Sequence, residues 1–123
     1  MITVPISLGE LYDKISILEI KMSKIIDADK LNNISNELEM LKTISALHPI
    51  NEQFYIELKS INQGLWKIED DIRDKERKNQ FDDEFINLAR RVYMANDKRS
   101  QIKKNINQEY NSDIIEEKSY NDY

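Results

Sequence analysis

The sequence predicts an all-α protein, an antiparallel four-helix bundle with a longer helix 3/helix 4 hairpin, a short N-terminal arm and a C-terminal tail. Its 123 residues include only two glycines and two prolines, while 33% are charged, a composition that favours long helices over turns. Apolar residues also recur at helical spacing in four successive segments, which turn and capping residues separate. The length fits one domain, residues 1–123.

The first helix is expected over about residues 8–26. Ser7 can cap its start, and Glu10, three residues later, can reach back to complete a capping box. The apolar residues that follow have the spacing of a heptad seam: Leu8, Leu11, Ile15, Leu18, Met22 and Ile25.

The second helix, about residues 30–47, begins after the segment "DAD" and ends before Pro49, which disfavours helix at His48. The third helix, about residues 51–78, has the clearest seam, formed by Phe54, Leu58, Ile61, Leu65, Ile68 and Ile72. Gly64 lies within it and suggests a close contact with another helix or a slight bend.

The fourth helix, about residues 82–110, is preceded by Asn79 and Asp82 as turn and cap residues. The third and fourth helices, roughly 40 and 45 Å long, should project beyond the first two, and short connections make neighbours antiparallel. Unbroken heptads would also allow these two helices to pair between chains as a homo-oligomer.

The tail after residue 110 is short and acidic, with room for one more helical turn. We expect its Tyr110, Tyr120 and Tyr123 to dock on the bundle, with Lys118 and Glu117 pairing nearby.

Composition excludes several classes of function. Without cysteine there is neither a disulfide nor a thiolate site, and the single His48 excludes a multi-histidine metal cage. The net charge of -5 without a strongly basic segment argues against nucleic-acid binding. No segment has the roughly 18 apolar residues of a membrane span, so we expect a cytoplasmic protein without membrane contact.

Arg99 interrupts the apolar stripe of the fourth helix, which otherwise consists of Phe85, Leu88, Val92, Ala95, Ile102 and Ile106. An unpaired charge there would cost several kcal/mol, so Arg99 must meet a carboxylate, reach water or bind an anion. A polar row flanks the seam of the third helix, and within it Glu69 is the natural partner for Arg99.

This polar set predicts an inter-helix pocket that binds a small anionic ligand or a protein partner, since arginines suit carboxylates and phosphates. The candidate ligand-binding residues are Arg99, Glu69, Arg73, Trp66, Asn62, Lys103, Glu19 and Lys14. The competing interpretation is an ion-pair network that only fixes the register of the helices.

Asp70 and Asp74 stand one helical turn apart and could share a divalent ion. The interleaved Arg73, Lys75, Arg77 and Lys78 instead indicate a solvated face with ion pairs along the helix. We therefore expect no cofactor and no metal.

Four blocks of the sequence, "SLGELYDKISILEIK", "LWKIEDDIRDKE", "NDKRSQIKKNIN" and "EEKSYNDY", resemble a family of small all-helical bacterial and phage-encoded proteins of unknown function. The resemblance covers nearly the whole chain in the same order. It implies no activity, substrate or cofactor, but its blocks contain the polar set around Arg99.

The function that the sequence favours is a helical binding or adaptor module without catalysis. The alternative is a small helical enzyme acting on a phosphorylated or dicarboxylate metabolite, with Arg99 and Arg73 holding the anion and Glu69 as acid or base. Nucleotide pyrophosphohydrolases, which use Mg²⁺, and chorismate mutases are helical enzymes of this kind. The chain matches neither motif. The second acidic pair of the pyrophosphohydrolases is not evident, and the helix order and spacing of the chorismate mutases differ.

Overall fold

The computed structural model describes all residues, 1–123, and contains four helices and no strand: α1 (Leu8–Lys24), α2 (Ala28–Ser45), α3 (Glu52–Arg77) and α4 (Asp83–Glu109). The predicted all-α four-helix fold with a longer second hairpin is confirmed. Each observed helix begins and ends within about two residues of its predicted range.

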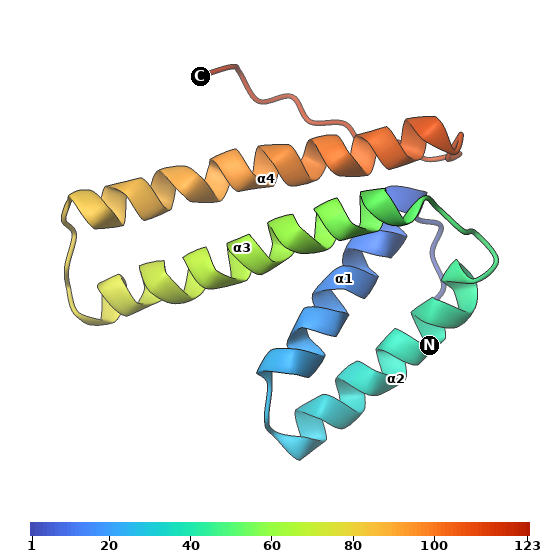
Figure 1. The fold of residues 1–123 in the computed structure, drawn as a ribbon, viewed down its shortest axis with the longest axis horizontal. Coiled ribbons are helices and arrows are strands. Elements are labelled where there is room, and N and C mark those ends of the chain that lie inside the picture. The colour runs from blue at the N-terminus through green and yellow to red at the C-terminus, as the bar shows by residue number, and fades with distance from the viewer.

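The helices form two hairpins that meet at one end (Figure 1). The α3 and α4 helices lie side by side, whereas α1 runs away from their shared end at an angle and α2 lies beyond it. The α1 helix packs against all three others, and α2 packs against α1 only. The α1 helix is therefore the central element of the bundle.

Side-chain caps define where the helices begin. The oxygens of Ser7, Asp27, Asn51 and Asp82 each accept a backbone N–H from the first turn of the following helix. Asn79 takes a positive φ of 52° in the turn between α3 and α4, as a turn residue does. Half of the predicted capping box is formed, since Ser7 Oγ accepts from the Glu10 N–H at 3.1 Å, whereas the Glu10 carboxylate accepts from Lys103 instead.

The apolar core lies where α1 meets the α3–α4 hairpin. Leu58 and Ile106 have no exposed surface at all. The other buried apolar residues are Leu11, Ile15, Leu18, Ile20, Leu65, Ile68 and Leu88. The α2 helix buries no residue fully, since it touches only one neighbour.

The prediction that Gly64 allows a close helix contact is wrong, because nothing lies within 4 Å of the position its Cβ would take. Gly9 on α1 has this role instead. A Cβ there would lie 2.6 Å from the backbone oxygen of Lys103 on α4. The α1 and α4 helices therefore approach each other closely at Gly9.

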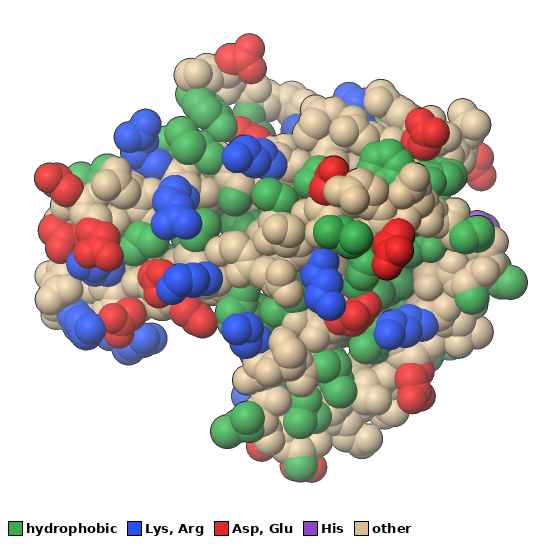
Figure 2. All heavy atoms as spheres, in the orientation of Figure 1, with side chains coloured by type: hydrophobic (Ala, Val, Ile, Leu, Met, Phe, Trp, Pro, Cys, Tyr) green, Lys and Arg blue, Asp and Glu red, His purple; other side chains and the backbone are tan.

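The tip of the α3–α4 hairpin carries side chains of both charges, interspersed over its surface (Figure 2). Asp74 pairs with Lys78 at 2.8 Å and with Arg77 at 3.4 Å, and Lys75 pairs with Asp82 and Glu84 at 3.0 Å each. These are the ion pairs of the solvated face that the sequence predicted.

The tail, which we call the C-terminal strap (residues 112–123), holds no further helical turn and runs back along α4 (Figure 1). Tyr123 docks by donating a hydrogen bond to Asp97 at 2.6 Å and packing edge-on against Tyr93. Tyr120 is 80% exposed, and its side chain makes no hydrogen bond to the helices. Glu117 pairs with Lys104 rather than with its neighbour in the strap.

Candidate functional site

The polar centre of the protein is the carboxylate of Asp13, which α1 carries into the interface with α3 and α4. The residue has no exposed surface. Arg99 of α4 donates from Nε to Asp13 Oδ1 at 2.9 Å and from Nη2 to Oδ2. Asn62 of α3 donates from Nδ2 to Asp13 Oδ1 at 2.8 Å and to Ser16 Oγ at 2.7 Å. One buried carboxylate thus joins three helices.

The predicted pairing of Arg99 with Glu69 is therefore wrong. Glu69 accepts from Arg73 Nε at 3.1 Å, one turn away on α3, and both side chains are largely exposed. Arg99 turns toward Asp13 of α1. A buried carboxylate such as Asp13 needs a positive partner far more than the exposed Glu69 does. Of the three environments that the sequence left open for Arg99, the structure shows a carboxylate partner.

Lys103 lies one turn after Arg99 and extends the centre. Its Nζ is 2.6 Å from Glu10, 3.3 Å from Glu116 and 3.8 Å from Asp13, and only 11% of its side chain is exposed. Burial by itself would lower the pKa of Lys103, but the bond to Glu10 and the nearby carboxylates outweigh it and raise that pKa. The two bonds to Asp13 likewise raise the pKa of Arg99.

The α1 side of this polar centre is a row of small and polar residues that the sequence analysis did not predict. Gly9, Asp13, Ser16 and Ile20 follow at spacings of four, three and four, and all four are buried. Gly9 lets the backbone of α4 approach, and its N–H donates to Asn107 Oδ1 at 2.7 Å. The signal was present as a heptad row of small and polar residues beside the apolar seam.

The residues around the centre line a pocket of about 340 Å³ between α1, α3 and α4, which we call the Trp66 pocket. Its lining combines an apolar wall with four charged side chains: Ile17, Ile20, Asn62, Leu65, Trp66, Glu69, Asp70, Arg73 and Arg99. Five of the eight predicted ligand-binding residues come together here, namely Asn62, Trp66, Glu69, Arg73 and Arg99.

Arg99 also lines a second hollow of about 360 Å³, which we call the strap pocket because the C-terminal strap covers it. Its lining is almost entirely polar: Glu10, Asn96, Asp97, Arg99, Ser100, Lys103, Glu116, Lys118 and Tyr120. The predicted site residue Lys103 belongs to this pocket and not to the Trp66 pocket.

The structure does not bring Glu19 and Lys14 to Arg99. Glu19 accepts a hydrogen bond from the Tyr55 hydroxyl and pairs with Lys59 at 3.2 Å. Burial alone would raise the pKa of Glu19, but these two donors outweigh it and hold that pKa below its usual range. Lys14 pairs with Glu10 at 3.7 Å with a half-exposed side chain.

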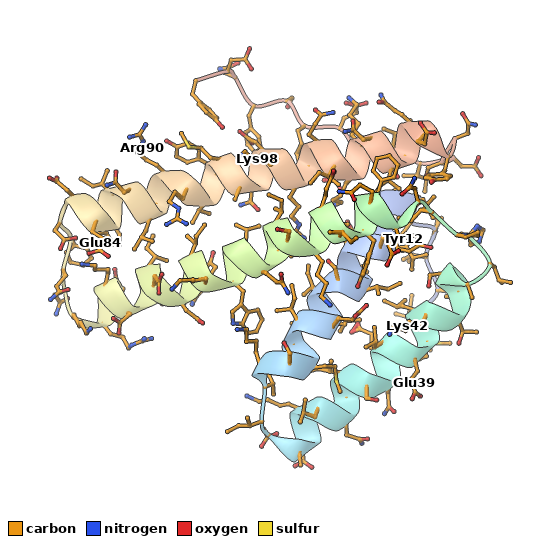
Figure 3. All side chains as sticks on the ribbon, in the orientation of Figure 1. Tyr12, Glu39, Lys42, Glu84, Arg90 and Lys98 are labelled. Atoms are coloured by element: carbon orange, nitrogen blue, oxygen red, sulfur yellow. The ribbon has the colours of Figure 1, made fainter.

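A separate polar contact closes the first hairpin. The Tyr12 hydroxyl lies near the backbone oxygens of His48, at 2.6 Å, and Ser45, at 3.2 Å (Figure 3). His48 therefore takes part through its backbone, at the turn that leads from α2 to α3.

No group of three or more histidine, cysteine, aspartate or glutamate side chains is placed to hold a metal ion. None of the four helices combines the length and the hydrophobicity that crossing a membrane requires.

A family model described as a family of unknown function (DUF6165) matches residues 2–123. This confirms the resemblance to a small helical family of unknown function that the four sequence blocks indicated. No curated protein and no solved structure matches the chain.

Proposed function

The chain belongs to this family of unknown function, and we propose that it is a binding module whose Trp66 pocket takes a small ligand with an anionic group and a flat apolar body. The observation that carries the proposal is the convergence of Asn62, Trp66, Glu69, Arg73 and Arg99 on one pocket. Its volume of about 340 Å³ falls in the range of small-molecule sites.

Arg99 is the anchor for the anionic group. Asp13 accepts two of its hydrogen bonds and so fixes the plane of the guanidinium. A guanidinium has more N–H groups than those two bonds use, so donors are left for a ligand carboxylate or phosphate. Because Asp13 already orients the group, little side-chain entropy is lost when a ligand binds.

Arg73 supplies a second cation at the rim of the pocket. Its pair with Glu69 is 72% and 46% exposed at the two side chains, and such a pair stabilises the fold only slightly. Arg73 can therefore exchange Glu69 for a ligand oxygen at small cost. Arg99 cannot exchange Asp13 in this way, because Asp13 is buried.

Trp66 and its apolar neighbours form the wall for the rest of the ligand. Trp66 is partly exposed, while Leu65 and Ile20 beside it are buried. An aromatic ring that keeps an open face offers stacking area to a flat group, and Arg73 and Arg99 line the same pocket.

The test uses Trp66 as reporter, because it is the only tryptophan of the chain. Benzoate and phenyl phosphate are titrated against the intrinsic fluorescence, with neutral benzyl alcohol as comparator. We expect a saturable change with the two anions and an affinity at least tenfold weaker for the alcohol, since charge-assisted bonds contribute about 1.5–3 kcal/mol.

Arg73→Ala should weaken anion binding, whereas the matched control Lys67→Ala should not. Lys67 is also exposed on α3 and also forms an (i, i+4) pair, with Asp71, but it does not line the pocket. Equal affinities for the anions and the alcohol, or equal loss in both variants, would contradict the proposal.

The enzyme alternative shares this pocket, because Glu69 lines it beside both arginines. It requires turnover of a bound phosphorylated or dicarboxylate compound, with or without Mg²⁺, that Glu69→Gln abolishes while binding persists. A protein partner would instead be retrieved by pull-down and lost with Arg73→Ala, while no small anion changes Trp66 fluorescence.

A further inference from the structure

The strap pocket holds two cations that α1 keeps in place. Lys103 is fixed by Glu10 at 2.6 Å, and Arg99 is fixed by Asp13. Both side chains are mostly buried, with 11% and 29% of their surfaces exposed. These two cations are therefore preorganised on the inner wall of the pocket, each beside a carboxylate of α1.

The strap contributes Glu116, Lys118 and Tyr120 to the outer wall, and Glu116 is the acidic one of the three. Glu116 bridges two ammonium groups, with Oε2 at 3.3 Å from Lys103 Nζ and Oε1 at 3.2 Å from Lys118 Nζ. These two cations hold the pKa of Glu116 below its usual range. Lys118 thus shares the Glu116 carboxylate with Lys103, which Glu10 also pairs with from the α1 side.

The bridge is easy to break. Glu116 and Lys118 are 42% and 49% exposed, so solvent screens their interaction and it contributes little to stability. The pocket has two other acidic members. Glu10 pairs with Lys103 from the α1 side, and Asp97 accepts a hydrogen bond from the Tyr123 hydroxyl.

We infer that the strap pocket binds a phosphate group, which displaces the Glu116 carboxylate from Lys103 and Lys118. A phosphate dianion matches the two ammonium groups better than one carboxylate does, and Arg99 and Ser100 provide further donors on the same wall. This site goes beyond the proposed function, because it is a different cavity and does not include Trp66.

The test follows backbone amide shifts by ¹⁵N NMR while phosphate replaces chloride at constant ionic strength, at a pH where phosphate is a dianion. In the unchanged protein we expect saturable shifts at residues 116–118. Glu116→Gln removes the competing charge, so it should bind phosphate about two- to fivefold more tightly. Lys118→Gln should weaken binding in that background.

The matched control is Glu117→Gln. Glu117 is the next residue of the strap and carries the same charge, but it pairs with Lys104 at 3.0 Å and does not line the pocket. Its phosphate affinity should equal that of the unchanged protein. Circular dichroism verifies that each variant folds.

Glycerol 3-phosphate is the second probe. If glycerol 3-phosphate binds as tightly as inorganic phosphate, the site recognises the phosphate group alone. If it binds more tightly, the neighbouring polar side chains also bind its hydroxyl groups. The inference is overturned if the shifts do not saturate. It is also overturned if Glu116→Gln and Glu117→Gln gain the same affinity for phosphate. Unchanged Trp66 fluorescence during the titration separates this site from the Trp66 pocket.

Discussion

Arg99 of α4 and Asp13 of α1, 86 residues apart in the sequence, form a two-bond ion pair at the junction of three helices. Asp13 has no exposed surface, whereas 29% of the Arg99 side chain still reaches solvent. The carboxylate therefore depends on the pair for its charge balance, and the arginine keeps a face for other contacts.

Asp13→Ala should lower the free energy of unfolding by about 3 kcal/mol or more, because it leaves Arg99 and Asn62 without their buried acceptor. Urea denaturation followed by circular dichroism measures the loss. A loss below about 1 kcal/mol would mean that the pair is not a structural centre.

Glu69→Ala should change the free energy of unfolding by no more than about 0.5 kcal/mol, because its only ion pair is with the exposed Arg73. The same denaturation experiment, run beside Asp13→Ala, provides the comparison. A large loss from Glu69→Ala would restore it as the partner of Arg99.

Gly9→Ala should destabilise the fold by about 1–3 kcal/mol, because the added Cβ would lie 2.6 Å from the Lys103 carbonyl oxygen and push α1 from α4. Gly64→Ala is its control: it meets nothing and should stabilise α3 by up to about 1 kcal/mol through helix propensity. Thermal unfolding of the two variants should move the midpoint in opposite directions. Movement in the same direction would contradict the close approach.

Glu19 should make stability depend on acid pH. Its pKa is lower in the folded protein, so its contribution is fully present above the ordinary carboxyl pKa and is lost as the pH falls through the folded value. The difference in unfolding free energy between the unchanged protein and Glu19→Gln should therefore shrink as the pH is lowered below the ordinary value. The exposed Glu57→Gln variant serves as reference. A difference that is independent of pH would show that Tyr55 and Lys59 do not favour the charged form.

The sequence predicted the helices well because their caps and apolar periods are local. Ser7 and Asp82 cap the helices at the expected places, and the four seams extend over the observed helices. The long α3–α4 hairpin follows from the lengths of the two patterns alone.

The partner of Arg99 could not be predicted in the same way, because it depends on which face of α1 meets the hairpin. The apolar seam of α1 has a strong helical period. The row that contains Asp13 also contains a glycine and a serine, so it has little hydrophobic signal. A heptad row of small residues indicates a close contact between two helices only once the facing helix is known. Glu69 was predicted instead because it lies in the polar row beside the apolar seam of α3.

The most direct test of the account is a double-mutant cycle between Asp13 and Arg99, measured by urea unfolding of Asp13→Ala, Arg99→Ala and the double variant. The account predicts a coupling of at least about 1 kcal/mol, as residues that share one buried network show. A coupling near zero, or one larger between Glu69 and Arg99, would contradict it.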